Sequence, residues 1–326
     1  MSSFAIYNYQ FAKIIRRARE QRLFGKDALE MEAEEAFPLR QQLFGTLLTD
    51  DYKGEQENCK IKFINGRSDK EFIHRHLMPP TDDIVVMRVA NVRNATYVNK
   101  DFNEDHVEDY QNCLVIIDNR PGIQRILIEN KKRAFQDVKQ VANILAFTFN
   151  LLLQRFSLKI ELMHLQESKK FWQYVEDRRS YPTGFYRVSF HLPHLNLERL
   201  RKVYDSVLNQ SRESFNSDLD WSFKANDGGQ IHFDKNDERQ KTLIAYMMED
   251  VGSNNIKLYP NQNKRKAIIV GKDSFAAIGI NESTIKRLEE DVRTGDLFGS
   301  AALNEIKIKT KTGIDPNIKN NDQTAK

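Results

Sequence analysis

One stretch of the chain carries residues that could perform metal-dependent chemistry. Asp118 ends an apolar run, and Glu129 and Lys131 end the next one. Two carboxylates on adjacent strands can hold a divalent metal such as Mg²⁺, and a nearby lysine can help to activate water. The pattern would suit the hydrolysis of a phosphodiester, with Mg²⁺ as the cofactor.

This arrangement resembles the core of restriction-type nucleases, but the expected hairpin geometry opposes it. The run NRPG after Asp118 predicts a four-residue turn, so that Asp118 pairs with Ile123. Glu129 then faces Asn112, and at about 3.3 Å per residue the two carboxylates lie roughly 20 Å apart. Glu108 could replace Asp118 only if the hairpin coils strongly. A metal-dependent nuclease is therefore the alternative hypothesis.

Histidines form a second candidate group. His74 and His76 are two residues apart and would share one face of a strand, while His191 and His194 lie near another strand end. Metal sites usually need three or four ligands at recognisable spacing, and neither a cysteine pair nor an HExxH helix accompanies these histidines. The loop-like stretch 77–80 follows directly. We therefore predict no metal site and, outside the nuclease hypothesis, no cofactor.

The cellular setting follows from the cysteines and the apolar segments. Cys59 and Cys113 are the only cysteines, which does not suit a disulfide framework. The longest uncharged stretch, 140–154, is shorter than the roughly 20 residues that a membrane span needs. These features predict a soluble, cytoplasmic protein without membrane insertion.

Positive charge gathers near the C-terminal end. Positions 256–326 hold 13 basic and 9 acidic residues, whereas the rest of the chain holds 37 of each. Such lysines could contact nucleic-acid phosphates without reading sequence. In a last predicted strand, 305–311, three lysines would share one face, although lysines also protect edge strands from aggregation. The predicted nucleic-acid contacts are Lys257, Lys264, Arg265, Lys266, Lys272, Lys307, Lys309 and Lys311.

Periodicity predicts an α+β fold with a β-rich first half and a mixed sheet, covered by helices on one face, in the second. The strongest helix, 135–154, is apolar on most sides and should be buried. We expect one domain over 1–156, a second over 157–314, and a disordered tail over 315–326. Further predicted strands are 4–14, 59–64, 83–90, 95–99, 112–118, 123–129, 158–164, 185–192, 219–223, 256–259 and 267–270. Further predicted helices are 27–37, 38–49, 168–178, 237–251 and 282–292, with another that begins at Asn196.

The second-half sheet should have one core face and one polar face, and base stacking on the polar face is not expected. Arg187 and its alternate neighbours form a polar face. An RNA-recognition sheet presents aromatic rings on its open face, whereas Phe190, Trp221 and Phe223 fall on the core face.

Two stretches carry a family resemblance. Positions 115–153 (VIIDNRPGIQRILIENKKRAFQDVKQVANILAFTFNLLL) and 185–196 (FYRVSFHLPHLN) resemble uncharacterised proteins encoded in bacterial anti-phage defence cassettes. The shared pattern is an apolar hairpin, a buried helix and a strand that ends in a proline turn. The resemblance implies an intracellular bacterial defence component and transfers no catalytic residue.

These observations favour a non-enzymatic cytoplasmic protein of a bacterial defence or mobile-element system. It would bind DNA or RNA through phosphate contacts, or a protein partner. The nuclease that uses Glu129 and Lys131 with Glu108 or Asp118 is one alternative. The other is a structural subunit whose apolar helix faces form an oligomer interface.

Overall fold

The computed structural model describes residues 1–14, 30–52, 61–66, 68–81, 83–98, 100–192, 219–251, 256–264, 266–270, 276–297 and 299–312. The chain divides into two compact units. The first unit comprises Met1–Ala5, Phe11–Leu162 and Ile278–Gly313, and the second comprises Ile6–Gln10, Met163–Ala277 and Ile314–Lys326. Helices accompany sheets in both units, which confirms the predicted α+β class.

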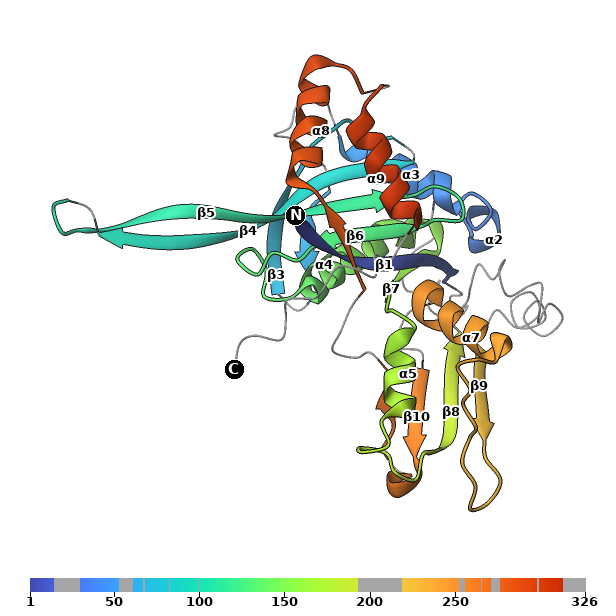
Figure 1. Cartoon of the computed structure of the whole chain (residues 1–326). Helices are drawn as coiled ribbons and strands as arrows, with labels where there is room; N and C mark the ends of the chain where they lie inside the picture. Colours follow the sequence, from blue (N-terminus) through green and yellow to red (C-terminus); the bar gives the residue numbers. More distant parts are fainter. Residues whose placement is uncertain are drawn as a thin grey trace. The chain divides into compact units, whose positions relative to one another are not determined.

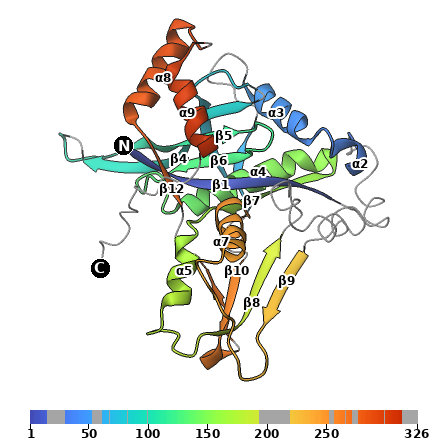
Figure 2. The same cartoon turned by 45° about the vertical axis from the view of Figure 1, so that its right-hand side comes forward.

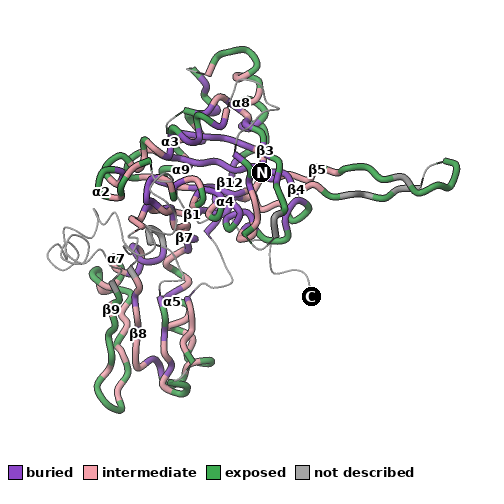
Figure 3. The backbone as a smooth tube through the Cα atoms, turned by 180° about the vertical axis from the view of Figure 1, so that it is seen from behind, coloured by how far each residue is buried: buried purple, intermediate pink, exposed green. Residues whose placement is uncertain are grey.

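The first unit is built on an eight-stranded sheet with the order β12-β1-β6-β5-β4-β3-β2, and β7 also pairs with β1 (Figure 1). Its strands are β1 (Ser2–Lys13), β2 (Phe63–Asn65), β3 (Ser68–His76), β4 (Ile84–Val98), β5 (Glu104–Asp118), β6 (Arg125–Glu129), β7 (Leu158–His164) and β12 (Ala277–Ile280). The predicted strands 83–90 and 95–99 are one strand, β4, because β5 pairs with it without interruption. The far end of this hairpin forms an exposed two-stranded arm (Figure 3).

Five helices belong to the described part of the first unit. They are α2 (Ala33–Ala36), α3 (Arg40–Asp51), α4 (Val138–Leu153), α8 (Glu282–Thr294) and α9 (Ala301–Thr312), and a short 3-10 helix, η2 (Gln154–Phe156), follows α4. The strongly predicted helix is α4, and Asp137 caps its first turn by accepting a hydrogen bond from the Lys139 amide. Val141, Leu145 and Phe149 are buried, but Leu151 is exposed, so the helix is buried along one side rather than all round.

The predicted last strand, 305–311, is wrong, because these residues form most of α9. Isoleucine and lysine alternate over a run too short to distinguish a strand from a helix. Ala302, Ile306 and Thr310 are buried at four-residue spacing, whereas Ile308 is exposed, as expected for one face of a helix. The helices α8 and α9 also lie in the first unit, whereas the sequence analysis assigned 157–314 to one separate domain. The cause is β12, which pairs with β1 in the first unit's sheet.

The second unit contains a four-stranded sheet with the order β11-β10-β8-β9, and β8, β9 and β10 are seen side by side in Figure 2. The strands are β8 (Phe185–Leu192), β9 (Leu219–Lys224), β10 (Ile256–Pro260) and β11 (Ile268–Ile269). The helices are α5 (Lys169–Glu176) and α7 (Glu238–Ala245), with a π-helical turn, η4 (Tyr246–Val251), after α7 and a short 3-10 helix, η6 (Asn261–Asn263), after β10. The three pairings are all antiparallel, where a mixed sheet was expected.

Helices cover one face of this second sheet, as predicted. Val188 and Phe190 from β8 and Leu258 from β10 pack with Phe171 of α5 and Ile244 of α7 in one apolar cluster. Because side chains alternate along a strand, the residues between these apolar positions point to the opposite, open face. The helix predicted to begin at Asn196 lies outside the described residues.

Candidate nucleic-acid interface

The open face of the second sheet carries a row of three large side chains across three strands. Arg187 of β8 pairs with Lys224 of β9 on one side and with Tyr259 of β10 on the other. The Arg187 guanidinium carbon lies 3.8 Å from the centroid of the Tyr259 ring. This cation–π contact holds the guanidinium on the sheet surface.

The next two rows are polar and partly satisfied within the sheet. The Ser189 and Ser222 hydroxyl oxygens are 3.1 Å apart, and Lys257 is exposed on the same row. At the far end, His191 Nδ1 lies 2.8 Å from Asp220 Oδ1. Asp220, the carboxylate nearest to Arg187 and Lys224 along these strands, is therefore engaged by His191.

A second tyrosine and a lysine border the first row. Lys264 Nζ lies 5.4 Å from the centroid of the Tyr186 ring, and the Tyr186 hydroxyl donates to the Lys264 carbonyl oxygen at 3.1 Å. The ring centroids of Tyr186 and Tyr259 are 6.1 Å apart. Two tyrosine rings and two cations thus form one continuous cluster.

The cations of this face form no ion pair with the residues that the structure describes. This holds for Arg187, Lys224, Lys257 and Lys264. Arg187 and Lys224 also occupy directly paired positions, and like charges at such positions destabilise a sheet. Charges placed together at a cost, without internal counter-ions, suit an anionic partner.

We call Arg187, Lys224, Lys257, Lys264, Tyr186 and Tyr259 the basic face. Lys257 and Lys264 were predicted, and Lys266 is exposed two residues beyond Lys264, whereas Arg265 and Lys272 lie outside the described residues. Tyr259 was not predicted from the sequence as an open-face aromatic. The signal was present, because Tyr259 is two residues after Lys257 and must share its face of β10.

Lys307, Lys309 and Lys311 do not form the predicted row, because they lie on a helix of the first unit. A step of two residues turns a helix by about 200°, so Lys309 points away from the other two. Lys309 Nζ lies 3.2 Å from Glu305 Oε1 and donates to the Gly279 carbonyl oxygen at 2.7 Å. Lys309 is therefore already engaged within the first unit.

The nuclease residues lie in a hairpin whose register differs from the predicted one. Asp118 pairs with Arg125 rather than Ile123, because the turn contains six residues and Gln124 adopts a left-handed backbone with φ of 48°. Glu129 follows four residues after Arg125, which places it roughly 13 Å from Asp118. Its carboxylate accepts a hydrogen bond from the Leu114 amide at 3.0 Å instead of facing Asn112.

Asp118 is used inside the fold. Its side chain is fully buried, and the Arg120 guanidinium donates to both carboxylate oxygens, at 2.9 Å from Nε and 2.6 Å from Nη2. The Thr310 hydroxyl of α9 also donates to this carboxylate. Asp118 therefore ties the hairpin to α9.

Glu108 is also remote from the remaining nuclease residues. It pairs with Asn94 on the exposed arm and accepts a hydrogen bond from the Tyr110 hydroxyl. Ten residues of strand separate it from Asp118, a span of roughly 33 Å. The structure thus does not bring the carboxylates of Asp118, Glu108 and Glu129 together. Lys131 follows the end of β6 and therefore does not complete a site with two of these carboxylates.

The remaining reactive groups are buried or lie elsewhere. Burial raises the pKa of the Cys113 thiol to about 12, so this cysteine is not a nucleophile. His194 lies outside the described residues, and His191 belongs to the open face. His74 and His76 are buried beside Asp51, a partner that local spacing could not reveal.

Among the described helices, none combines the length and apolar character needed to cross a membrane. No protein-family model matches the chain, and a search of the curated proteins finds no similar sequence.

Proposed function

We propose that this protein binds single-stranded nucleic acid through the basic face of its second unit. The observation that carries the proposal is a group of four cations that form no ion pair with the described residues and lie beside two tyrosine rings. Phosphates would supply the missing counter-ions, and release of condensed salt ions would favour binding. Contacts of this kind grip the backbone without selecting a sequence.

The same face offers surfaces for unpaired bases. The guanidinium of Arg187 is stacked over the Tyr259 ring, and both tyrosine rings and guanidinium planes can stack on bases. Bases can reach such a stack only when they are not enclosed in a duplex. The combination therefore favours a single strand over double-stranded DNA.

The proposal is for a binding protein rather than an enzyme. The four residues of the alternative nuclease are distributed over the hairpin and its arm, which supports this choice. A place in a bacterial defence or mobile-element system, with a protein partner, stays a prediction from the resemblance of the two stretches.

The test is fluorescence anisotropy with labelled single strands and duplexes of about 20 nucleotides, at about 50 and 200 mM salt. We expect a single strand to bind more tightly than the duplex and its affinity to fall steeply with salt. In the double variant Arg187→Glu/Lys257→Glu, affinity should fall at least about tenfold and the salt dependence should flatten, because two phosphate contacts are lost.

The matched control is Lys100→Glu/Lys286→Glu, which makes the same charge change at exposed positions of the first unit. It should leave affinity within about twofold of the unaltered protein, since it removes no contact of the basic face. Equal losses in both double variants, or no binding at low salt, would overturn the proposal. Label shortening that requires Mg²⁺ and disappears in Glu129→Ala would support the nuclease instead.

A further inference from the structure

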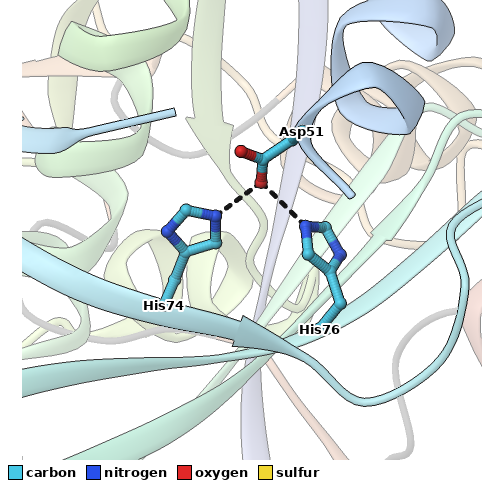
Figure 4. A group of neighbouring side chains, drawn as sticks. All are labelled: Asp51, His74 and His76. Atoms are coloured by element: carbon cyan, nitrogen blue, oxygen red, sulfur yellow. Dashed lines mark hydrogen bonds and ion pairs between the residues drawn. The ribbon is translucent and has the colours of Figure 1, made fainter. Parts of the chain in front are cut away.

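Three polar side chains converge inside the first unit. His74 Nε2 lies 2.5 Å from Asp51 Oδ2, and His76 Nε2 lies 2.7 Å from the same oxygen (Figure 4). The exposed fractions are 2% for Asp51, 6% for His74 and 1% for His76. Two imidazole nitrogens and one carboxylate oxygen therefore meet at a single buried point.

Two elements position these groups. His74 and His76 are alternate residues of β3, so they share the inward face, while Ile73, directly before His74, is half exposed. Asp51 is the last residue of α3. The Ile61 amide donates to Asp51 Oδ1 at 2.6 Å, which orients the carboxylate and leaves Oδ2 for the histidines.

The carboxylate of Asp51 is surrounded by hydrogen-bonding groups. Burial alone would raise its pKa, but the hydrogen bonds from His74 and His76, the attraction of His74 and the Ile61 amide together hold the pKa well below its usual range. Among the described residues His76 Nδ1 is buried without a hydrogen-bond partner, so the Nε2 contact is the polar contact that fixes this ring. A buried carboxylate oxygen that faces two imidazole nitrogens is a set of metal-ligand atoms.

We propose that Asp51, His74 and His76 bind one divalent transition-metal ion of the zinc class. The three ligand atoms all lie within 4.8 Å of one another. Two ligands at about 2.0–2.1 Å from a tetrahedral zinc ion are roughly 3.4 Å apart, so the observed contacts need to widen by less than about 1 Å. Two nitrogens and one oxygen suit zinc or iron(II), whereas magnesium and calcium select oxygens.

The surroundings favour a structural role for this ion. The Phe63 ring centroid is 4.6 Å from that of His74, and the Tyr52 ring centroid is 5.7 Å from that of His76. With the ligands this deeply buried, a bound ion would join the end of α3 to β3 and strengthen the fold. The described residues supply three buried ligands.

The experiment uses the full chain without a polyhistidine tag, purified without chelator. Elemental analysis should find about one transition-metal ion per chain, and cobalt(II) exchanged into the site should give the intense visible absorption of a low-symmetry site. Zinc should also raise the Tm of metal-depleted protein, since the ion binds the folded state.

Asp51→Asn and His76→Gln, which replace ligands with groups of similar size, should each lose the cobalt signal while circular dichroism shows a folded chain. The matched control is His106→Gln/His191→Gln, which alters two exposed histidines and should keep one ion per chain. The proposal is overturned if the folded, unaltered protein contains no metal and binds neither zinc nor cobalt at about 0.1 mM. It is equally overturned if both ligand variants retain the ion. Neither result depends on nucleic-acid binding.

Discussion

The buried cluster of Asp51, His74 and His76 and the basic face of the second unit treat polar side chains in opposite ways. In the buried cluster, the side-chain polar contacts that fix the rings end on Asp51. On the basic face, Arg187 and Lys224 occupy paired positions, and neither forms an ion pair with a carboxylate of the described residues. A buried polar group that lacks a partner costs free energy, whereas an exposed group can form hydrogen bonds with water. Unpaired charge is therefore informative at the surface, and the geometry of paired groups is informative in the core.

Asp118 shows why a sequence motif must be tested against this contrast. A carboxylate at the end of an apolar strand looks available for a metal in the sequence. In the fold, Arg120 and Thr310 already satisfy it, so it behaves like the buried cluster and not like the basic face.

The largest effect should come from breaking the buried cluster. Asp51→Ala leaves two buried imidazoles without their shared acceptor, and loss of one partner of a buried ionic group costs about 3–5 kcal/mol of unfolding free energy. Urea unfolding followed by circular dichroism, in the presence of chelator, measures the change. The surface counterpart Asp220→Ala removes an exposed partner of His191 and should cost less than about 1 kcal/mol. Equal costs for the two variants would contradict the contrast.

The second-largest effect is expected on the basic face, as a loss of binding free energy. Tyr259→Leu removes the ring under Arg187, and loss of one stacked base costs about 1–3 kcal/mol of binding free energy. Anisotropy titrations should show weaker single-strand binding with an unchanged salt slope, because the phosphate contacts remain. Tyr110→Leu, at an exposed tyrosine of the arm, should bind normally. An unchanged affinity in Tyr259→Leu would show that bases do not stack there.

A smaller effect tests whether Asp118 belongs with the internally satisfied groups. Thr310→Val removes one hydrogen bond to this carboxylate and should cost about 1–2 kcal/mol of unfolding free energy in urea titrations. Thr312→Val is the control, since that hydroxyl is exposed and donates only to carbonyls of its own helix. If both variants unfold at the same urea concentration, Thr310 does not anchor α9 through Asp118.

The elements with strong local patterns were predictable from the sequence. The predicted strands 158–164 and 185–192 match β7 and β8 in full, because apolar and polar residues alternate between clear turn residues. The alternation of isoleucine and lysine over α9 wrongly indicated a strand. The conformation of these residues is determined by their packing in the first unit and not by their local sequence pattern. The longer hairpin turn depends on the left-handed backbone of Gln124, a residue type that gives no signal for it.

The two candidate sites also differ in how far they could be predicted from the sequence. Lys257 and Tyr259 lie two residues apart on one strand, so their shared face could be predicted from spacing alone. Asp51 joins His74 and His76 from a helix that precedes them by more than twenty residues. That contact exists only once α3 packs beside β3, and no local rule reports it.

The smallest expected effect addresses the cost of the basic face itself. Lys224 stands directly opposite Arg187, and like charges in this position oppose sheet formation. Lys224→Gln should therefore raise the unfolding free energy by about 0.2–0.5 kcal/mol while it weakens single-strand binding, because one cation is lost from the face. Lys257→Gln, opposite Ser189, should weaken binding without the gain in stability. Urea titrations of both variants measure the change in unfolding free energy, and anisotropy measures the change in single-strand affinity. If only Lys224→Gln combines a gain in stability with a loss of binding, the fold tolerates the unfavourable charge pair because an external anion relieves it. A loss of stability in Lys224→Gln would instead mean that the charge pair is satisfied within the sheet.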